Sequence, residues 1–189
     1  ALLHMAKMIE WEGAVCEPVL LEGEPVEQIP ALAGRRAVDR VIVATRSTRG
    51  LDRLLTGSVA ESLMTALDVP VCVIGPRAVH NPFRSMRGGH ILLTLSLHHD
   101  RLDCVQLASL LAVRRRSILT FLHVLDVAGM GTASRKDARG AAHASIVALA
   151  SAVPGPLPEF LIAIREGSPP HKILDEDSCP GWDFIVMGS

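Results

Sequence analysis

Residues 183–188 read Asp-Phe-Ile-Val-Met-Gly and repeat an earlier hexapeptide of the chain, Asp-Arg-Val-Ile-Val-Ala at residues 39–44. Residues 166–169, Glu-Gly-Ser-Pro, likewise repeat Glu-Gly-Glu-Pro at residues 22–25. Both pairs share one offset of 144 residues. An offset of this length corresponds to a whole domain, because solenoid repeats run to roughly 20 to 50 residues. We therefore expect two tandem copies of one fold.

The offset also predicts how the two copies divide the chain. Residues 1–78 should be the C-terminal part of a first domain, and residues 90–189 the N-terminal part of a second domain. The interval 79–89 carries Pro82, Gly88 and Gly89 and is typical of a linker. Completing both copies gives a parent protein of about 270 residues, an ordinary size for two domains.

The charge balance argues against nucleic acid as a partner. The chain has 19 Lys and Arg against 20 Asp and Glu, a formal net charge of −1, whereas phosphate backbones are bound by clustered cations. The basic run 114–116 ends an apolar helical pattern, where cations stabilise the helix dipole. No apolar run reaches the about 18 residues of a membrane span. The four cysteines form no Cys-x-x-Cys pair, so we expect reduced thiols.

Short apolar runs rich in β-branched residues alternate with helical patterns along the chain. Near-continuous apolarity is typical of parallel strands that are covered on both faces. Between the runs, apolar residues recur every three or four positions, as at 59–67 and 104–112, which places one helical face against a sheet. This alternation predicts a doubly wound, open parallel α/β sheet. We expect strands at residues 15–21, 38–44, 69–75, 91–96, 117–125, 160–165 and 184–188, and a loop at 129–140 before a helix over 141–152.

The segment 41–75 carries the most specific pattern. An apolar strand is followed by the frame Ala44-x2-Ser47-x9-Gly57-Ser58, then by Pro-Val and a further apolar strand. This arrangement resembles the universal stress protein family (UspA-like), whose signature is Gly-x2-Gly-x9-Gly-Ser between the fourth strand and the fourth helix. The run 91–96, the segment Leu-His-Val-Leu-Asp at 122–126 and the ending Val-Met-Gly-Ser are similar to other parts of that family's domain.

The resemblance implies a Rossmann-like domain with strand order 3-2-1-4-5. Its ligand would lie beyond the carboxyl ends of the first and fourth strands, where the strand order reverses. Glycines there let backbone N–H groups approach phosphate, and a helix N-terminus adds further amides. The implied cofactor is ATP or another adenine nucleotide, with Mg²⁺ only as the ion that the nucleotide carries. The corresponding residues here are Val43, Ala44, Ser47, Gly57, Ser58, Val59, Leu95, Ser96, Val124, Met187 and Gly188.

Three of these positions depart from the family pattern. Ala44 and Ser47 stand where the signature has glycines, so their Cβ atoms would crowd a phosphate group. Ser96 stands where nucleotide-binding members have an Asp that contacts the nucleoside. We therefore expect partly degenerate sites, with nucleotide weak or absent in the second domain.

Structural explanations compete with function at several positions. Gly57 and Ser58 are compatible with a plain helix start and a serine cap, and His123 with a core histidine whose hydrogen bonds are satisfied. The run His-His-Asp at 98–100 suggests a metal ligand set. However, adjacent histidines in a strand point to opposite faces, and a loop with an aspartate cap explains the run better. We predict no metal site and no catalytic residue.

Two classes of function stay open at this point. The first is a cytoplasmic stress-response module with regulatory nucleotide sites. The second is an interaction scaffold. In such a scaffold, the strand at 71–74 would pair the two copies as a pseudo-dimer or join two chains as a homodimer. The scaffold could also be the soluble regulatory part of a transporter. We expect no main enzymatic role, although slow ATP hydrolysis stays open, because the chain has no Ser-Gly-Gly-x-Asp-Ser loop and no paired carboxylates at a strand end.

Overall fold

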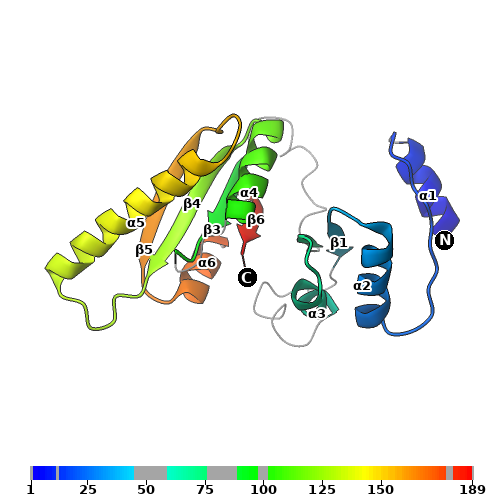
Figure 1. Ribbon diagram of the computed structural model, residues 1–189, viewed down its shortest axis with the longest axis horizontal. Helices are drawn as coiled ribbons and strands as arrows, with labels where there is room; N and C mark the ends of the chain where they lie inside the picture. The colour runs from blue at the N-terminus through cyan, green and yellow to red at the C-terminus, as the bar shows by residue number, and fades with distance from the viewer. Residues whose placement is uncertain are drawn as a thin grey trace. The chain divides into compact units, whose positions relative to one another are not determined.

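The computed structural model describes residues 2–11, 13–44, 59–75, 89–97, 102–177 and 181–188. The chain divides into two compact units, residues 1–80 and 81–189, and each unit has its own parallel sheet (Figure 1). The division falls inside the interval 79–89, where the sequence predicts a linker. Apart from Gly89, that interval lies outside the described residues.

In its described residues, the second unit is a parallel sheet of four strands connected by three helices. The strands are hydrogen-bonded in the order β5-β4-β3-β6. The chain therefore builds outward from β3 to β5 and then returns through a helix to the other side of β3. The elements are β3 (His90–Thr94), α4 (Leu102–Arg115), β4 (Ile118–Leu125), α5 (Thr132–Ala152), β5 (Phe160–Glu166), α6 (Pro169–Asp177) and β6 (Trp182–Met187).

The strand β3 lies inside the sheet of this unit and has three consecutive residues that are fully buried. Ile91, Leu92 and Leu93 have 0% exposure, because β4 and β6 flank the strand on both edges. Ile91 and Leu93 pack in one core with Val105 of α4 and Ile146 of α5, and these two helices lie together on one side of the sheet (Figure 1). Leu92, which alternates to the opposite face, is equally buried. The parallel α/β architecture predicted from the sequence is thus confirmed.

The strand order reverses between β3 and β6. Counted from the first strand of the unit, the order is 3-2-1-4, which agrees with the corresponding part of the predicted 3-2-1-4-5. A fifth strand is not among the described residues of this unit, so the complete order stays a prediction.

The first unit contains a pair of parallel strands, with Ala44 of one strand opposite Ile74 of the other. Its second helix begins at Pro25, where the missing N–H and the preset φ suit the first turn. Its third helix packs on the second helix and on the last strand through buried Ala60 and Leu63. The elements are α1 (Leu2–Trp11), α2 (Pro25–Arg36), β1 (Val41–Ala44), α3 (Val59–Ala66) and β2 (Val71–Ile74).

The strand predicted at residues 15–21 is wrong, because these residues have irregular backbone. Pro18 has no N–H to donate. The described strands of the first unit, β1 and β2, pair with each other, so no strand lies beside this segment. Val15 and Leu20 are accordingly 103% and 85% exposed. An apolar run becomes a strand only where a neighbour supplies the backbone hydrogen bonds.

The loop predicted at 129–140 is also wrong over most of its length. Helix α5 begins at Thr132, and residues 132–140 are polar and mostly exposed. They lack the apolar periodicity that marks a helix in a sequence. The other six predicted strands are present, with ends shifted by up to three residues.

A β-bulge lies where β3 and β6 begin. The register shifts between His90 and Ile91, which leaves Asp183 as the extra residue of β6. The Asp183 carboxylate accepts a 3.0 Å hydrogen bond from the backbone N–H of His90. A Cβ at Gly89 would collide with this carboxylate. Residue 89 is therefore a glycine because of a close approach from another strand.

One substitution should have opposite effects at two glycines. At Gly89 an added methyl group meets the Asp183 carboxylate, so Gly89→Ala should lower the free energy of unfolding by about 1–3 kcal/mol. Gly140 lies inside α5 with open space around its Cβ position, so Gly140→Ala should raise it by about 0.5–1 kcal/mol. Urea unfolding followed by circular dichroism measures both changes. Equal effects at the two positions would contradict the close approach at Gly89.

An ion pair ties the irregular segment of the first unit to α2. Two guanidinium nitrogens of Arg36 lie 2.9 and 2.7 Å from the carboxylate oxygens of Glu17. These hydrogen bonds, and then the charge of Arg36, hold the pKa of Glu17 below its usual value. Both side chains are exposed, so dissolved salt screens the pair.

Arg36→Gln should raise the pKa of Glu17 toward that of a free glutamate, whereas Arg35→Gln should leave it unchanged. Because the folded-state pKa of Glu17 is lowered, the pair contributes stability above the unfolded-state pKa. That contribution is lost as the pH falls through the folded-state pKa. An NMR titration of the Glu17 carboxyl carbon measures the shift. The same Glu17 pKa in both variants would show that the pair does not form.

Candidate functional site

The carboxyl ends of β3 and β6 lie side by side at the point where the strand order reverses. In open parallel α/β sheets, ligands bind beyond such a point. The register pairs the last residue of β3 with Met187, so Leu95 and Ser96 leave the sheet beside Gly188. Val124 lies near the end of the neighbouring strand β4. We call these five residues the switch-point edge.

The outer positions of the switch-point edge are accessible. Ser96 and Gly188 are exposed and Met187 is 50% exposed, whereas Leu95 is buried and Val124 is half-buried. A hydroxyl, a glycine backbone and an apolar side chain are thus available at one place. None of the five residues carries a charge. The edge therefore offers hydrogen bonds and apolar contact rather than ion pairing.

The side chain of His123 is hydrogen-bonded to the switch-point edge. His123 lies on β4 with 8% exposure, and its Nδ1 is 2.9 Å from the backbone oxygen of Leu95. This contact agrees with the interpretation of His123 as a core histidine with a satisfied hydrogen bond. Its partner, however, is the backbone of a predicted site residue. The sequence could not show this, because 28 positions separate the two residues.

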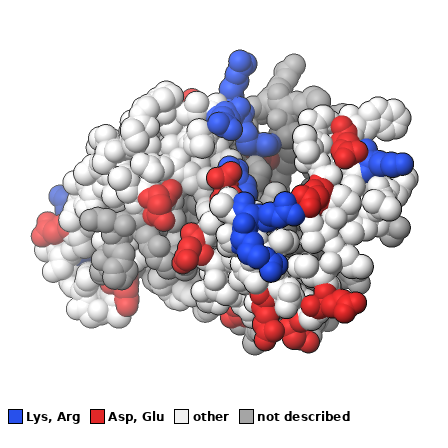
Figure 2. All heavy atoms as spheres, turned by 45° about the vertical axis from the view of Figure 1, so that its right-hand side comes forward, with Lys and Arg blue, Asp and Glu red and all other residues white. Residues whose placement is uncertain are grey.

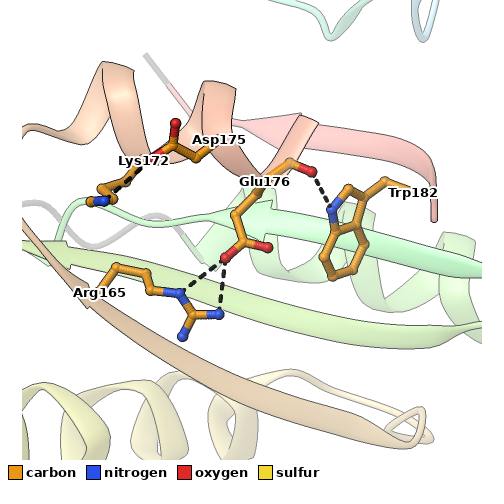
Figure 3. Close-up of polar contacts among 5 residues, drawn as sticks. All are labelled: Arg165, Lys172, Asp175, Glu176 and Trp182. Carbon is orange, nitrogen blue, oxygen red and sulfur yellow. Dashed lines mark hydrogen bonds and ion pairs between the residues drawn. The ribbon is translucent and has the colours of Figure 1, made fainter. Parts of the chain in front are cut away.

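A polar clamp sets the position of α6, the helix that leads into β6 (Figure 3). Glu176 of α6 accepts hydrogen bonds from Arg165 of β5, at 3.0 Å from Nε and 2.9 Å from Nη2. The indole N–H of Trp182, at the start of β6, donates to the backbone carbonyl of Glu176 at 3.1 Å. That carbonyl lies in the last turn of the helix, where intrahelical partners run out. The clamp thereby joins both strands that flank α6 in the chain.

The predicted site residues of the first unit are only partly described. Val43 and Ala44 are the last residues of β1, and Val59 is the first residue of α3, 44% exposed. The other predicted positions, Ser47, Gly57 and Ser58, lie outside the described residues. The structure therefore brings five predicted residues together in the second unit. The prediction for the signature segment of the first unit is not tested.

The basic run 114–116 has a structural explanation. Arg114 and Arg115 occupy the last turn of α4, where positive charge stabilises the helix dipole. The guanidinium of Arg115 lies 5.0 Å from the ring centroid of Phe184, within the range of a cation–π contact. On the face drawn in Figure 2, Asp and Glu side chains lie among the Lys and Arg side chains.

The predicted His-His-Asp run at 98–100 lies outside the described residues. In the part of the chain that the structure describes, His, Cys, Asp and Glu side chains form no cluster of three that could hold a metal ion. Within the same residues, no helix is both long and apolar enough to cross a membrane.

Glu176→Gln should destabilise the second unit, because it removes the charge that the Arg165 guanidinium contacts. Glu176 is only 18% exposed at its side chain and Arg165 is 47% exposed, so we expect a loss of about 0.5–1.5 kcal/mol. Asp175→Asn is the matched control, because Asp175 pairs with Lys172 at a 67% exposed position (Figure 3). Urea unfolding followed by circular dichroism compares the two. An equally large loss of stability in Asp175→Asn would show that the Glu176–Arg165 pair contributes no more than an exposed ion pair.

Comparison with known proteins relates the first unit to a family by sequence. The sequence profile of the Universal stress protein family matches residues 2–75. A universal stress protein of Methanocaldococcus jannaschii is 35% identical over 74 residues, which are 39% of this chain and 44% of that protein. The stress response protein NhaX of Bacillus subtilis is 36% identical over 55 residues, 29% of this chain and 33% of that protein. The chain thus spans less than half the length of these relatives.

A solved structure is similar in fold to the whole chain. The crystal structure of a universal stress protein from Archaeoglobus fulgidus matches 100% of this chain with a TM-score of 0.65 and 21% sequence identity, and the chain spans 63% of that one. At this identity the likeness establishes the fold, an α/β structure with parallel sheets. Residues 2–75 thus match the universal stress protein family by sequence, which confirms the resemblance predicted from the sequence.

Proposed function

We propose that this chain holds adjoining parts of two tandem universal stress protein domains and acts as a cytoplasmic stress-response module that binds adenine nucleotide weakly. Binding, rather than turnover, would be its main role. The observation that carries the proposal is the accessible switch-point edge, which lies where open α/β sheets bind ligands.

Backbone geometry supports the tandem arrangement. Gly23 and Gly167, 144 residues apart, have φ of 123° and 124°. The helices that follow them, α2 and α6, begin at Pro25 and Pro169, which share the same offset. Residues 41–44 of β1 correspond to 185–188, which overlap β6. Two segments with the same special φ and the same helix start are expected from copies of one domain.

The two units together also support the five-strand order. The second unit shows the order 3-2-1-4, and its fourth strand, β6, corresponds to β1 of the first unit. In the first unit, β1 pairs in parallel with β2, which would be the fifth strand of the fold. Superposed on the shared strand, with β2 on its outer side, the two partial sheets would make the order 3-2-1-4-5.

The residues of the switch-point edge fit a nucleoside better than a phosphate chain. Met187 and Val124 offer apolar contact for a base, and the Ser96 hydroxyl offers a hydrogen bond to a sugar or base. A bound nucleotide would bring its own negative charge and Mg²⁺. Because the edge has no charged side chain, we propose weak nucleotide binding in the second domain. In the first domain, we assign phosphate contacts to its own signature segment, residues 44–58.

An open sheet edge favours a second candidate function, that of an interaction scaffold. Among the described residues of the first unit, β2 is paired on one side only, and Ile74 on it is 37% exposed. Unpaired backbone groups on such a strand can pair with another strand. We propose β2 as the strand through which two domains or two chains associate, as a pseudo-dimer or a homodimer.

Nucleotide binding is tested by denaturing the purified protein, identifying released nucleotide by mass spectrometry, and titrating ATP, ADP and AMP by calorimetry. We expect weak adenine nucleotide binding that Ser96→Asp strengthens about tenfold or more, since a hydrogen bond to a carboxylate contributes about 1.5–3 kcal/mol. Ser145→Asp, the same charge change at an exposed position of α5, should have no effect.

An equal change in nucleotide affinity in Ser96→Asp and Ser145→Asp would show that only the net charge of the protein affects binding. No released nucleotide and no heat with wild type or Ser96→Asp would reject the nucleotide site and favour the scaffold.

A further inference from the structure

We propose that His123 is a positioning residue of the switch-point edge, which holds the carbonyl of Leu95 and so determines how the chain leaves β3 at Ser96. The hydrogen bond itself is observed in the structure. That this edge meets a nucleotide rests on the proposed function.

The partner of the ring determines its tautomer. A backbone carbonyl oxygen can only accept a hydrogen bond, so the Nδ1 of His123, 2.9 Å from the Leu95 oxygen, carries the proton. In the neutral ring the Nε2 is then the unprotonated nitrogen and a hydrogen-bond acceptor. Since the ring is only 8% exposed, losing this contact would leave buried polar atoms without partners.

The same contact completes a two-point attachment of Leu95 to β4. Its backbone N–H donates to the Leu122 carbonyl at 2.9 Å, and its carbonyl accepts from the His123 ring. In a regular parallel ladder, the carbonyl would accept from a backbone N–H of the next strand. Here a side chain takes that position one residue after β3 ends at Thr94. The ladder therefore ends at a defined peptide.

The residue that follows this attachment is the exposed Ser96. The Ser96 N–H and the Leu95 carbonyl belong to one peptide group. Because that group is planar, the directions of the two bonds are linked. Holding the carbonyl toward His123 therefore also sets the direction of the Ser96 N–H. The side chain of His123 thus acts on the edge through the backbone rather than by touching a ligand.

The tautomer is measured directly on the wild-type protein by two-bond ¹H–¹⁵N NMR of its histidine rings at neutral pH. We expect the Nδ1 of His123 to show the protonated-type resonance and the Nε2 the unprotonated type. The opposite pattern would overturn the proposal, whether or not any nucleotide binds.

Three variants test the positioning role. The amide nitrogen of Asn stands near the place of an imidazole Nδ1, so His123→Asn keeps a donor for the Leu95 carbonyl, whereas His123→Leu removes it. We expect the backbone amide resonances of Ser96 and Gly188 to stay close to wild type in His123→Asn and to shift in His123→Leu. His143→Leu, at an exposed position of α5, is the control and should leave these resonances unchanged.

Calorimetric titration with ATP separates this proposal from the proposed function. If wild type binds, His123→Leu should weaken binding about tenfold or more, while His123→Asn stays within about threefold. Equal binding and unchanged amide resonances in both variants would overturn the positioning role. If wild type does not bind ATP, the nucleotide proposal fails, and the tautomer and the Ser96 resonance still decide the role of His123.

Discussion

The second unit depends on the burial of β3 on both faces and both edges. A strand in this position exposes no backbone group to water, so its hydrogen bonds and its side chains must all find partners within the sheet and its helices. Ile91, Leu92 and Leu93 meet this demand with 0% exposure. Because β4 and β6 lie on opposite sides of β3, the strand order has to reverse there. The candidate site is thus a consequence of how the core is built.

The ends of β3 are held by polar groups that the apolar core does not supply. At its start, the Asp183 carboxylate accepts from the His90 N–H and excludes any side chain from Gly89. At its end, the ring of His123 is hydrogen-bonded to the Leu95 carbonyl. The first of these contacts is exposed, whereas the second is buried. A buried polar contact adds little net stability but costs much when one partner is lost. The contact of His123 therefore defines the exit of the chain at the switch-point edge more closely than apolar packing alone would.

Positions 144 residues apart in the two units differ in their side chains. The clamp of the second unit, formed by Arg165, Glu176 and Trp182, corresponds at an offset of 144 residues to Leu21, Leu32 and Val38. An ion pair and an indole thus stand where the first unit has aliphatic side chains. The segments that contain these positions still keep a glycine with φ near 123° and a helix that starts at a proline. At this offset, the backbone features of the two units are therefore more alike than their side chains.

The fold class was predictable from the sequence because the signals for it are local. Apolar runs mark strands buried on both faces, and the Gly-x-Pro sequences at 23–25 and 167–169 mark the starts of two helices. The same reasoning brought Leu95, Ser96, Met187 and Gly188 to one edge, since parallel strands end together. It failed at residues 15–21 and could not find the partners of His123 or Glu176. Those outcomes depend on groups 6 to 28 residues away in the chain, or on whether another strand lies beside the segment. Only the folded chain brings such groups within hydrogen-bonding distance.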